Sequence, residues 1–323
     1  MDVRALRYFQ TVAECGSYSR GSELLRISQP AVSRTIRNLE FEIGRPVFMR
    51  HGHGVSLTEA GRILLERTQS ILRQIEQAKA EVKGGLSSPS GTISFAVPPA
   101  AGHFLVPPLV ERFERDYPNV FLNVTGGFSG NIHEWLVRGQ VDLACVHDPL
   151  PQRGFAVTPL INEEVFLVGK VGSFPPDQTH VRVEELTSLP LILPSRPNAS
   201  RRLIDAWLSP QGLFATPKME VNDHTIARAL VRRGIGFSLL TRGAIEGELR
   251  RGEIDARPFM PRATWPLALI RFENGARSEI HEIFVRAIAQ TVHEQTACGA
   301  WPGEAIQPAS RAAGAGPARP GDV

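Results

Sequence analysis

The sequence predicts an α/β protein with a small all-α domain at its N-terminus and a larger domain of alternating strands and helices. Three observations lead to this prediction. Apolar residues recur at helical spacing through residues 3–41, and a long helical stretch with a regular apolar seam follows at 59–83. Beyond a Gly/Ser-rich linker at 84–91, short apolar runs alternate with helical segments, which is typical of a parallel or mixed sheet covered by helices.

Length and composition are those of a multi-domain globular protein, with 323 residues of which 42% are hydrophobic and 21% charged. No stretch approaches the apolar length of a membrane span, and the first residues lack the apolar core of a secretion signal. We therefore expect a cytoplasmic protein without membrane contacts. Cys15, Cys145 and Cys298 show neither paired nor metal-ligand spacing, so we expect buried free thiols, with a thiol switch as the alternative.

The positive charge of the chain is concentrated at its N-terminus. Residues 1–83 contain 13 Lys+Arg and 9 Asp+Glu, whereas the remaining 240 contain 23 and 24, from totals of 36 and 33. A local basic excess of this kind is compatible with nucleic-acid binding.

Three short helices are expected in the N-terminal domain. The first covers 3–14 and ends at Gly16, and the second covers 20–25 after Ser17. A three-residue break separates it from a third helix at 29–41, where Pro30 suits the first turn. Two short helices joined by a tight turn form a helix-turn-helix, here at about 19–41.

The outward face of the 29–41 helix carries the side chains that best suit DNA recognition. With Val32, Ile36 and Leu39 turned inward, the polar residues between them point outward, and Arg and Gln can reach base edges in the major groove. Residues 46–57 alternate around a turn and predict a hairpin, or wing, beside the DNA backbone. The DNA-binding candidates are Ser28, Gln29, Pro30, Ser33, Arg34, Arg37, Arg50, His51 and His53.

Two alternatives apply to these candidates. The polar face of the 29–41 helix could be an ordinary solvated surface. His51 and His53 also have the spacing of a metal pair, but no third ligand lies nearby in the sequence, so we expect neither a metal nor a cofactor.

The long helix that Thr58 can cap has an apolar seam with a period of 3.5 residues, the pattern of a helix that pairs with another helix. We therefore expect a dimerisation arm. Its seam residues are Leu64, Thr68, Ile71, Ile75, Ala78 and Val82. The alternative, a helix that lies on its own domain, is favoured by Thr68 and Ala78, which are weak seam residues.

Several predicted strands of the larger domain end in turns that lead into helices. In open α/β sheets, ligands bind beyond the carboxyl ends of the strands, and helix N-termini there suit a carboxylate or another anion. The effector-binding candidates in these turns are Ala100, Ala101, Gly102, His103, Ser129, Gly130, His147, Ser195, Asn198 and Asp223. The alternative is that the polar members are only helix caps and the histidines only structural residues.

The segment 6–61, with the signatures "SQPAVSRTIRNLE" and "LTEAG", resembles the DNA-binding domain of LysR-type transcriptional regulators. The segments "YPNVFLNVTGGFSGNIHEWLVRGQVDLACVHDP", "LPLILPSRPNASRRLID" and "VRRGIGFSLLT" resemble the effector domains of the branch that includes the nitrogen assimilation control regulator. The resemblance covers about 1–296. Gly21 and Ser22 stand where many members have two alanines, and Pro98 to Ala101 stand where many have a hydroxyl.

The resemblance implies a winged helix-turn-helix domain at 1–58, a linker helix and hinge at 59–90, and an effector domain at 91–297 similar to type II periplasmic binding proteins. The expected effector subdomains are 91–162 with 266–297, and 163–265, and the tail 298–323 is expected to be disordered by composition.

The implied function is that of a regulator that binds double-stranded DNA and is modulated by a small, anionic effector. Its other expected partners are itself, as a homodimer or homotetramer, and RNA polymerase. No catalytic motif suggests an enzyme. The alternative is a solute-binding module whose N-terminal helices only mediate assembly.

Overall fold

The computed structural model describes residues 1–52, 54–83, 89–149, 152–196, 198–273 and 278–306. The wing residue His53, most of the predicted linker and the tail 307–323 lie outside these described residues. Within them, no helix combines the length and the apolar character that a membrane crossing needs.

The N-terminal domain is the predicted three-helix unit with a two-stranded wing. Its apolar side chains form one small core, which contains Phe9, Val12, Val32, Ile36, Leu39, Val47, Phe48 and Val55. The elements are α1 (Val3–Cys15), α2 (Tyr18–Leu25), α3 (Gln29–Ile43), β1 (Phe48–His51) and β2 (Gly54–Leu57). The α2–α3 turn is the expected three-residue break, and α3 continues two residues beyond its predicted end.

Glycine at position 21 has a packing reason. A Cβ there would lie 2.9 Å from Cγ2 of Val12, so α2 can approach α1 this closely only because residue 21 has no side chain. Gly21 therefore permits the close contact between α1 and α2.

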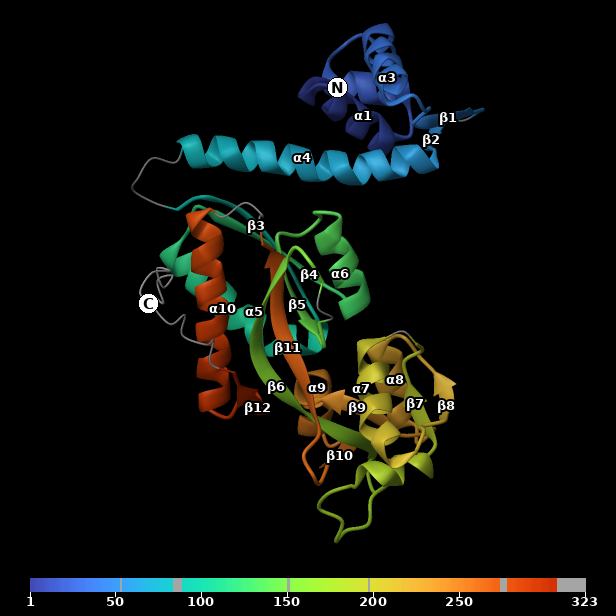
Figure 1. Ribbon diagram of the computed structural model, residues 1–323, viewed down its shortest axis with the longest axis vertical. Coiled ribbons are helices and arrows are strands. Elements are labelled where there is room, and N and C mark those ends of the chain that lie inside the picture. Colours follow the sequence, from blue (N-terminus) through green and yellow to red (C-terminus); the bar gives the residue numbers. More distant parts are fainter. Residues whose placement is uncertain (53, 84–88, 150–151, 197, 274–277, 307–323) are drawn as a thin grey trace, which may run out of the picture.

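Helix α4 (Glu59–Lys83) begins where the "LTEAG" signature fixes the chain. The Thr58 hydroxyl donates to the Pro46 carbonyl at 2.7 Å and accepts from the Gly61 amide at 2.9 Å. A Cβ on Gly61 would lie 2.0 Å from the Val47 carbonyl oxygen, so this close approach also requires glycine. Figure 1 shows α4 lying between the N-terminal domain and the larger domain.

The larger domain is built on a mixed sheet, as predicted. The principal strand order is β10-β6-β11-β5-β3-β4, in which β3 pairs in parallel with β4 and β5, and the pairs of β6 are antiparallel. A small parallel pair, β7 with β8, lies apart. The strands are β3 (Gly91–Val97), β4 (Val120–Gly126), β5 (Leu143–His147), β6 (Phe155–Lys170), β7 (Leu191–Leu193), β8 (Pro217–Glu220), β9 (Ser238–Thr241), β10 (Ile254–Pro258), β11 (Thr264–Phe272) and β12 (Gly303–Ala305).

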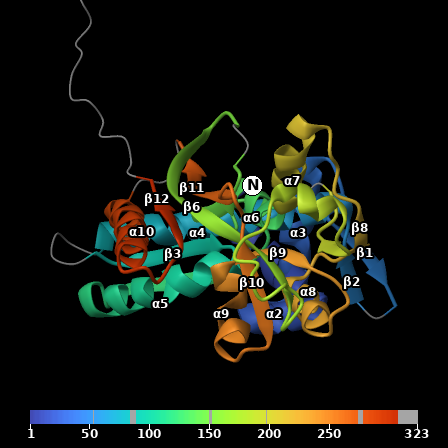
Figure 2. The same cartoon turned by 90° about the horizontal axis from the view of Figure 1, so that it is seen from below.

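Helices cover the sheet in two groups, which form two lobes. The first lobe contains α5, α6 and α10, and the second contains α7 and α8 (Figure 1). Seen from below, α5 and α10 lie at one end of the domain, and α7 and α8 lie at the other (Figure 2). The helices are α5 (Pro99–Asp116), α6 (Ser129–Val137), α7 (Ala199–Leu208), α8 (His224–Arg232), α9 (Arg242–Arg250) and α10 (Glu279–Ala297), with short 3-10 helices at Val183–Thr187 and Ser209–Gln211.

Two long strands, β6 and β11, run through both lobes. Both subdomain boundaries predicted from the sequence, after residues 162 and 265, fall inside these strands. The first half of β6 contains Pro159 and the polar run Asn162 to Glu164, which hide the alternation expected of a strand.

The beginning of the C-terminal tail is ordered, so the prediction of disorder from residue 298 is wrong for residues 298–306. Strand β12 pairs with β6, and Trp301 is 1% exposed within the core of the first lobe. Its ring stacks on Phe104 at a centroid distance of 5.5 Å, and its Nε1 donates to Oε1 of Glu163 at 2.8 Å. The Ala/Gly/Pro composition concealed a single buried anchor.

Trp301→Ala should destabilise the protein because it leaves a large cavity and removes a donor from a buried carboxylate. We expect a loss of about 3–5 kcal/mol, read as a lower urea midpoint of the larger domain. Glu304→Ala, which removes an exposed side chain of the same segment, is the matched control and should cost at most about 1 kcal/mol. Equal midpoints for Trp301→Ala and the wild type would contradict the anchoring role.

Candidate functional site

Arg34 and Arg37 are exposed along α3, and Gln29 is exposed at its first position. Ser28 and Pro30 are exposed at the start of the helix, where Ser28 occupies the N-cap position without a side-chain capping bond. In the wing, His51 is exposed, and the guanidinium of the exposed Arg50 lies 5.7 Å from the ring centroid of Tyr18. These side chains form one polar, basic surface that includes the start of α3 and the wing.

Ser33 does not belong to this surface. It is only 7% exposed, which corrects the prediction that it points outward. Ser33 lies about 60° around the helix from Ile36, because each residue turns the helix by about 100°, so it falls at the edge of the buried stripe. Ala31 and Asn38 are exposed instead, on the same side as Arg34.

The predicted seam residues of α4 fall into two groups that differ in burial. Leu64 packs against the core of the N-terminal domain, and Thr68 is fully buried within the single chain. Thr68 is therefore not available to a partner helix, whereas Leu64 is only partly buried. Ile71 and Ile75 are half-buried and Ala78 is exposed, while the side chain of Val82 lies outside the described part. The first part of α4 thus packs within the chain itself.

Contacts on both sides hold α4 in place. Arg7 of α1 forms an ion pair with Glu76. On the other side, Arg138 at the end of α6 forms an ion pair with Glu66 at 3.0 Å, and the Gly139 turn packs against Ser70. The linker helix therefore contacts both domains directly.

A cavity of about 610 Å³ lies between the two lobes. Five predicted effector candidates line it: Ser129, Gly130, His147, Ser195 and Asn198. They come from the first turn of α6, the end of β5 and the β7–α7 loop, which are carboxyl ends of strands or the turns after them. The rule that places ligands at these ends therefore brought together residues far apart in sequence.

The other effector candidates lie elsewhere. Ala100 lines a much smaller cavity next to the first, also bordered by Ser200 and His224. Ala101 is fully buried in the core, and Asp223 caps α8 by accepting from the Ile226 amide at 2.9 Å. Gly102, Ala101, His103 and Asp223 line neither cavity. The start of α5 packs against α9, where a Cβ on Gly243 would lie 2.0 Å from the Ala100 carbonyl oxygen, so this contact requires glycine at position 243.

Several lining residues were not predicted from the sequence. Phe128, Asp148, Arg202 and Asn222 all line the larger cavity. Asp148 directly follows β5, so the strand-end rule that selected His147 could have selected it too. Arg202 lies one helical turn after Asn198, and this spacing was its only signal.

His147 combines two roles that the sequence analysis treated as alternatives. It lines both cavities, and its ring Nε2 lies 2.5 Å from Oε2 of the buried Glu163. Its backbone amide donates to the Ser129 hydroxyl at 3.1 Å. The imidazole is therefore a structural residue that also forms part of the cavity wall.

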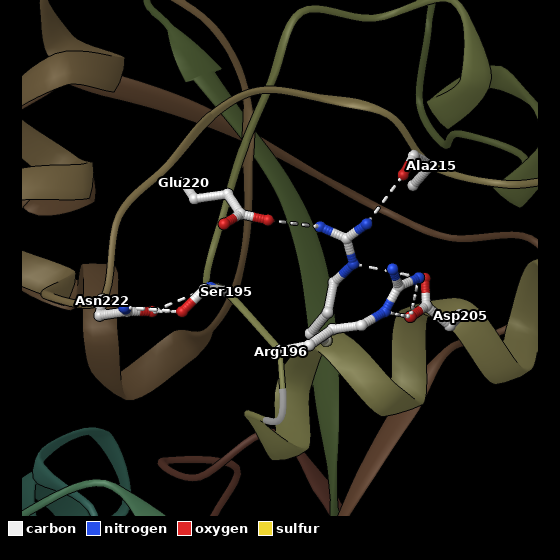
Figure 3. Close-up of polar contacts among 7 residues, drawn as sticks. Ser195, Arg196, Asp205, Ala215, Glu220 and Asn222 are labelled. Carbon is white, nitrogen blue, oxygen red and sulfur yellow. Dashed lines mark hydrogen bonds and ion pairs between the residues drawn. The ribbon is translucent and has the colours of Figure 1, made fainter.

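A polar network fixes the β7–α7 loop, as Figure 3 shows. The Ser195 amide donates to Oδ1 of Asn222 at 2.9 Å, and the Ser195 hydroxyl forms a second bond to the same side chain. On the far side of the loop, Asp205 accepts from Arg196 at 2.7 Å and from the buried Arg201 at 3.3 Å. The loop thus holds Ser195 and Asn198 at the cavity.

The three cysteines differ in their surroundings. Cys145 is fully buried, and its burial, followed by the charge of Glu163, raises the pKa of its thiol. A thiol kept protonated in this way is unreactive. Cys15 is half-buried and Cys298 is exposed, so the expectation of three buried thiols is wrong for these two.

A winged helix-turn-helix, a long linker helix and a two-lobed α/β domain with a cavity between the lobes define a ligand-responsive DNA-binding regulator. Residues 3–62 match the family "Bacterial regulatory helix-turn-helix protein, lysR family", and residues 87–292 match the "LysR substrate binding domain". The chain belongs to the LysR family of transcriptional regulators, as its sequence resemblance indicated.

Known proteins agree with this assignment over most of the chain. The transcriptional regulator BbuR of Bordetella bronchiseptica is 29% identical over 94% of each chain, and the nitrogen assimilation regulatory protein Nac of Escherichia coli is 30% identical over 76% of this chain and 79% of its own. In fold, the chain is similar to full-length OxyR of Pseudomonas aeruginosa, with a TM-score of 0.68 at 22% identity over 91% of this chain and 95% of that one. It is also similar to CbnR in complex with its target DNA, with a TM-score of 0.69 at 21% identity over 90% and 100%.

The half-buried His224 predicts a pH dependence of stability. Burial of the imidazole, followed by the nearby His147 and Arg228, lowers its pKa from 6.5 to about 4. Between these two values the unfolded chain binds more protons than the folded one, so stability falls as the pH falls. We expect a loss of about 1–2 kcal/mol between pH 7 and pH 5, measured by urea denaturation.

His224→Gln should remove most of this slope and leave the stability difference between pH 7 and pH 8 small. The exposed His180 of the same lobe offers the matched control, His180→Gln. An unchanged slope in His224→Gln would show that other groups cause the loss.

Proposed function

We propose that this regulator reads its operator through Gln29, Arg34 and Arg37 of α3, with Ser28, Pro30, Arg50, His51 and His53 beside the DNA backbone. The observation that carries the proposal is the exposed basic surface on the helix after the three-residue turn. Arg pairs with guanine and Gln with adenine in the major groove, while phosphate contacts set the register.

We also propose that a small organic effector with a carboxylate binds in the 610 Å³ cavity between the lobes. Its volume is within the range of about 300–1,000 Å³ that is typical of small-molecule sites. The cavity offers hydroxyl, amide and guanidinium donors, the last from Arg202. In this proposal the chain acts in the cytoplasm on DNA and RNA polymerase, without a catalytic role.

Arg34→Ala should weaken binding to DNA taken from upstream of the protein's own gene. Loss of one base contact costs about 1–3 kcal/mol, and the expected result is a higher dissociation constant in a gel-shift titration. Ser33→Ala is the matched control on the same helix, because its buried side chain is expected to make no contact with DNA. Salt-insensitive binding, or equal affinities for Arg34→Ala and the wild type, would contradict the assigned readers.

Dimerisation through the second part of α4 makes a separate prediction. Ile71→Glu combined with Ile75→Glu should convert dimers or tetramers into monomers in light scattering, because both charges would enter the apolar contact between helices. Gln74→Glu, at an exposed position between them, should leave the mass unchanged. If the double variant kept the mass of the wild type, α4 would not be the dimer contact.

A further inference from the structure

The larger cavity carries one positive and one negative side chain on facing walls. Arg202 extends from α7 in the second lobe, and Asp148 follows β5 in the first. Nη2 of Arg202 lies 2.9 Å from Oδ2 of Asp148 and 3.3 Å from the Asp148 carbonyl oxygen. Among the described residues that line the cavity, these two are the only ones with a permanent charge. The wall as described is therefore dipolar and has no net charge.

The backbone holds each charge at a defined place. Asp148 has a φ of +47°, in the left-handed region that Asp and Asn tolerate better than most residues, and its amide donates to the Pro266 carbonyl of β11 at 2.9 Å. Arg202 lies in the first turn of α7. The two charges thus belong to different lobes.

The rest of the wall offers both hydrogen bonds and apolar contact. Side-chain amides come from Asn131, Gln152, Asn198 and Asn222, and apolar surface comes from Phe128 and Val146. A ligand with a charged end and an apolar or uncharged side chain has partners for each part.

We propose that the effector is a zwitterion of the α-amino acid class, whose carboxylate binds Arg202, whose ammonium group binds Asp148 and whose side chain contacts Phe128 and Val146. This inference rests on the proposed function, in which the cavity is the effector site. An anion without the ammonium group would pair with Arg202 in place of Asp148. The carboxylate of Asp148 would then lose its partner and lie beside the negative charge of the anion. A zwitterion replaces one ion pair by two.

Opening the ion pair for such a ligand is inexpensive. The side chains of Arg202 and Asp148 are 36% and 29% exposed, so water already screens their attraction. A ligand inserted between them would still connect the two lobes, now through its own two charges.

The experiment uses the full-length protein and the twenty proteinogenic L-amino acids in a thermal-shift screen. Calorimetry then compares the amino acid with the largest shift against its desamino acid and its decarboxylated amine. We expect at least one amino acid to stabilise the protein, and both analogues to bind at least roughly tenfold more weakly. No stabilisation by any of the twenty, or a desamino acid that binds as tightly, would overturn the zwitterion.

Two variants distinguish recognition of charge from a structural effect. Asp148→Asn keeps a residue that tolerates the left-handed backbone but removes the negative charge. It should therefore weaken the binding of the amino acid and strengthen the binding of the desamino acid. Arg202→Gln should weaken the binding of the amino acid and strengthen the binding of the decarboxylated amine. A purely structural role would weaken all three ligands alike. Arg233→Gln, at the exposed end of α8 and lining neither cavity, is the control and should leave all affinities unchanged.

The outcomes also separate this inference from the proposed function. If the desamino acid binds best and Arg202→Gln abolishes its binding, the cavity is the effector site but the zwitterion is wrong. If an amino acid binds and neither variant changes its affinity, the effector does not use this cavity. Gel shifts with the upstream DNA, run on the same variants, test the DNA-binding proposal independently.

Discussion

The effector domain depends on how a buried carboxylate is satisfied at the point where the two lobes meet. Glu163 lies in the long strand β6 and is 1% exposed. A lone buried charge there would cost several kcal/mol, so its partners are obligatory. One oxygen faces His147 and the other accepts from Trp301. The first contact forms part of the cavity wall, and the second anchors the C-terminal segment, which adds β12 to the edge of β6. Core, cavity and chain end are thus joined at one side chain.

The strands that carry this carboxylate also define what the lobes can do. Because β6 and β11 run through both lobes without interruption, the lobes can change their relation only by bending or twisting of these two strands. The Arg202–Asp148 pair spans the opening on the other side of the cavity. A ligand bound there contacts both lobes away from these strands, so it can change how far the two lobes close. The size of any response is limited by the difference in its affinity for the two arrangements.

Features that depend on neighbouring residues were predictable from the sequence, and features that depend on distant ones were not. Helix spacing, the three-residue turn and the Thr58 cap gave the N-terminal domain almost to the residue, and the strand-end rule found half of the effector candidates in the larger cavity. The prediction that Ser33 points outward was wrong because the boundary of a buried stripe depends on the neighbouring helices, and periodicity alone does not include them. Trp301 and Glu163 are 138 residues apart, and nothing local in an Ala/Gly/Pro-rich tail indicates that one tryptophan enters a core. The prediction that Thr68 faces a partner helix was wrong for a similar reason, since the surface that buries it comes from elsewhere in the chain.

Helix α6 connects the cavity to the linker helix. Its first residue, Ser129, lines the cavity and accepts from the His147 amide, and Arg138 at its other end pairs with Glu66 of α4. A helix of 9 residues is stiff, so a displacement of its first turn is carried to its last. Helix α4 in turn is bound to α1 through Arg7 and Glu76 and packs on the same core as α3. The cavity and the recognition helix are therefore linked by packed elements and two ion pairs. Coupling between them remains a free-energy difference, which only a ligand that favours one arrangement of the lobes can supply.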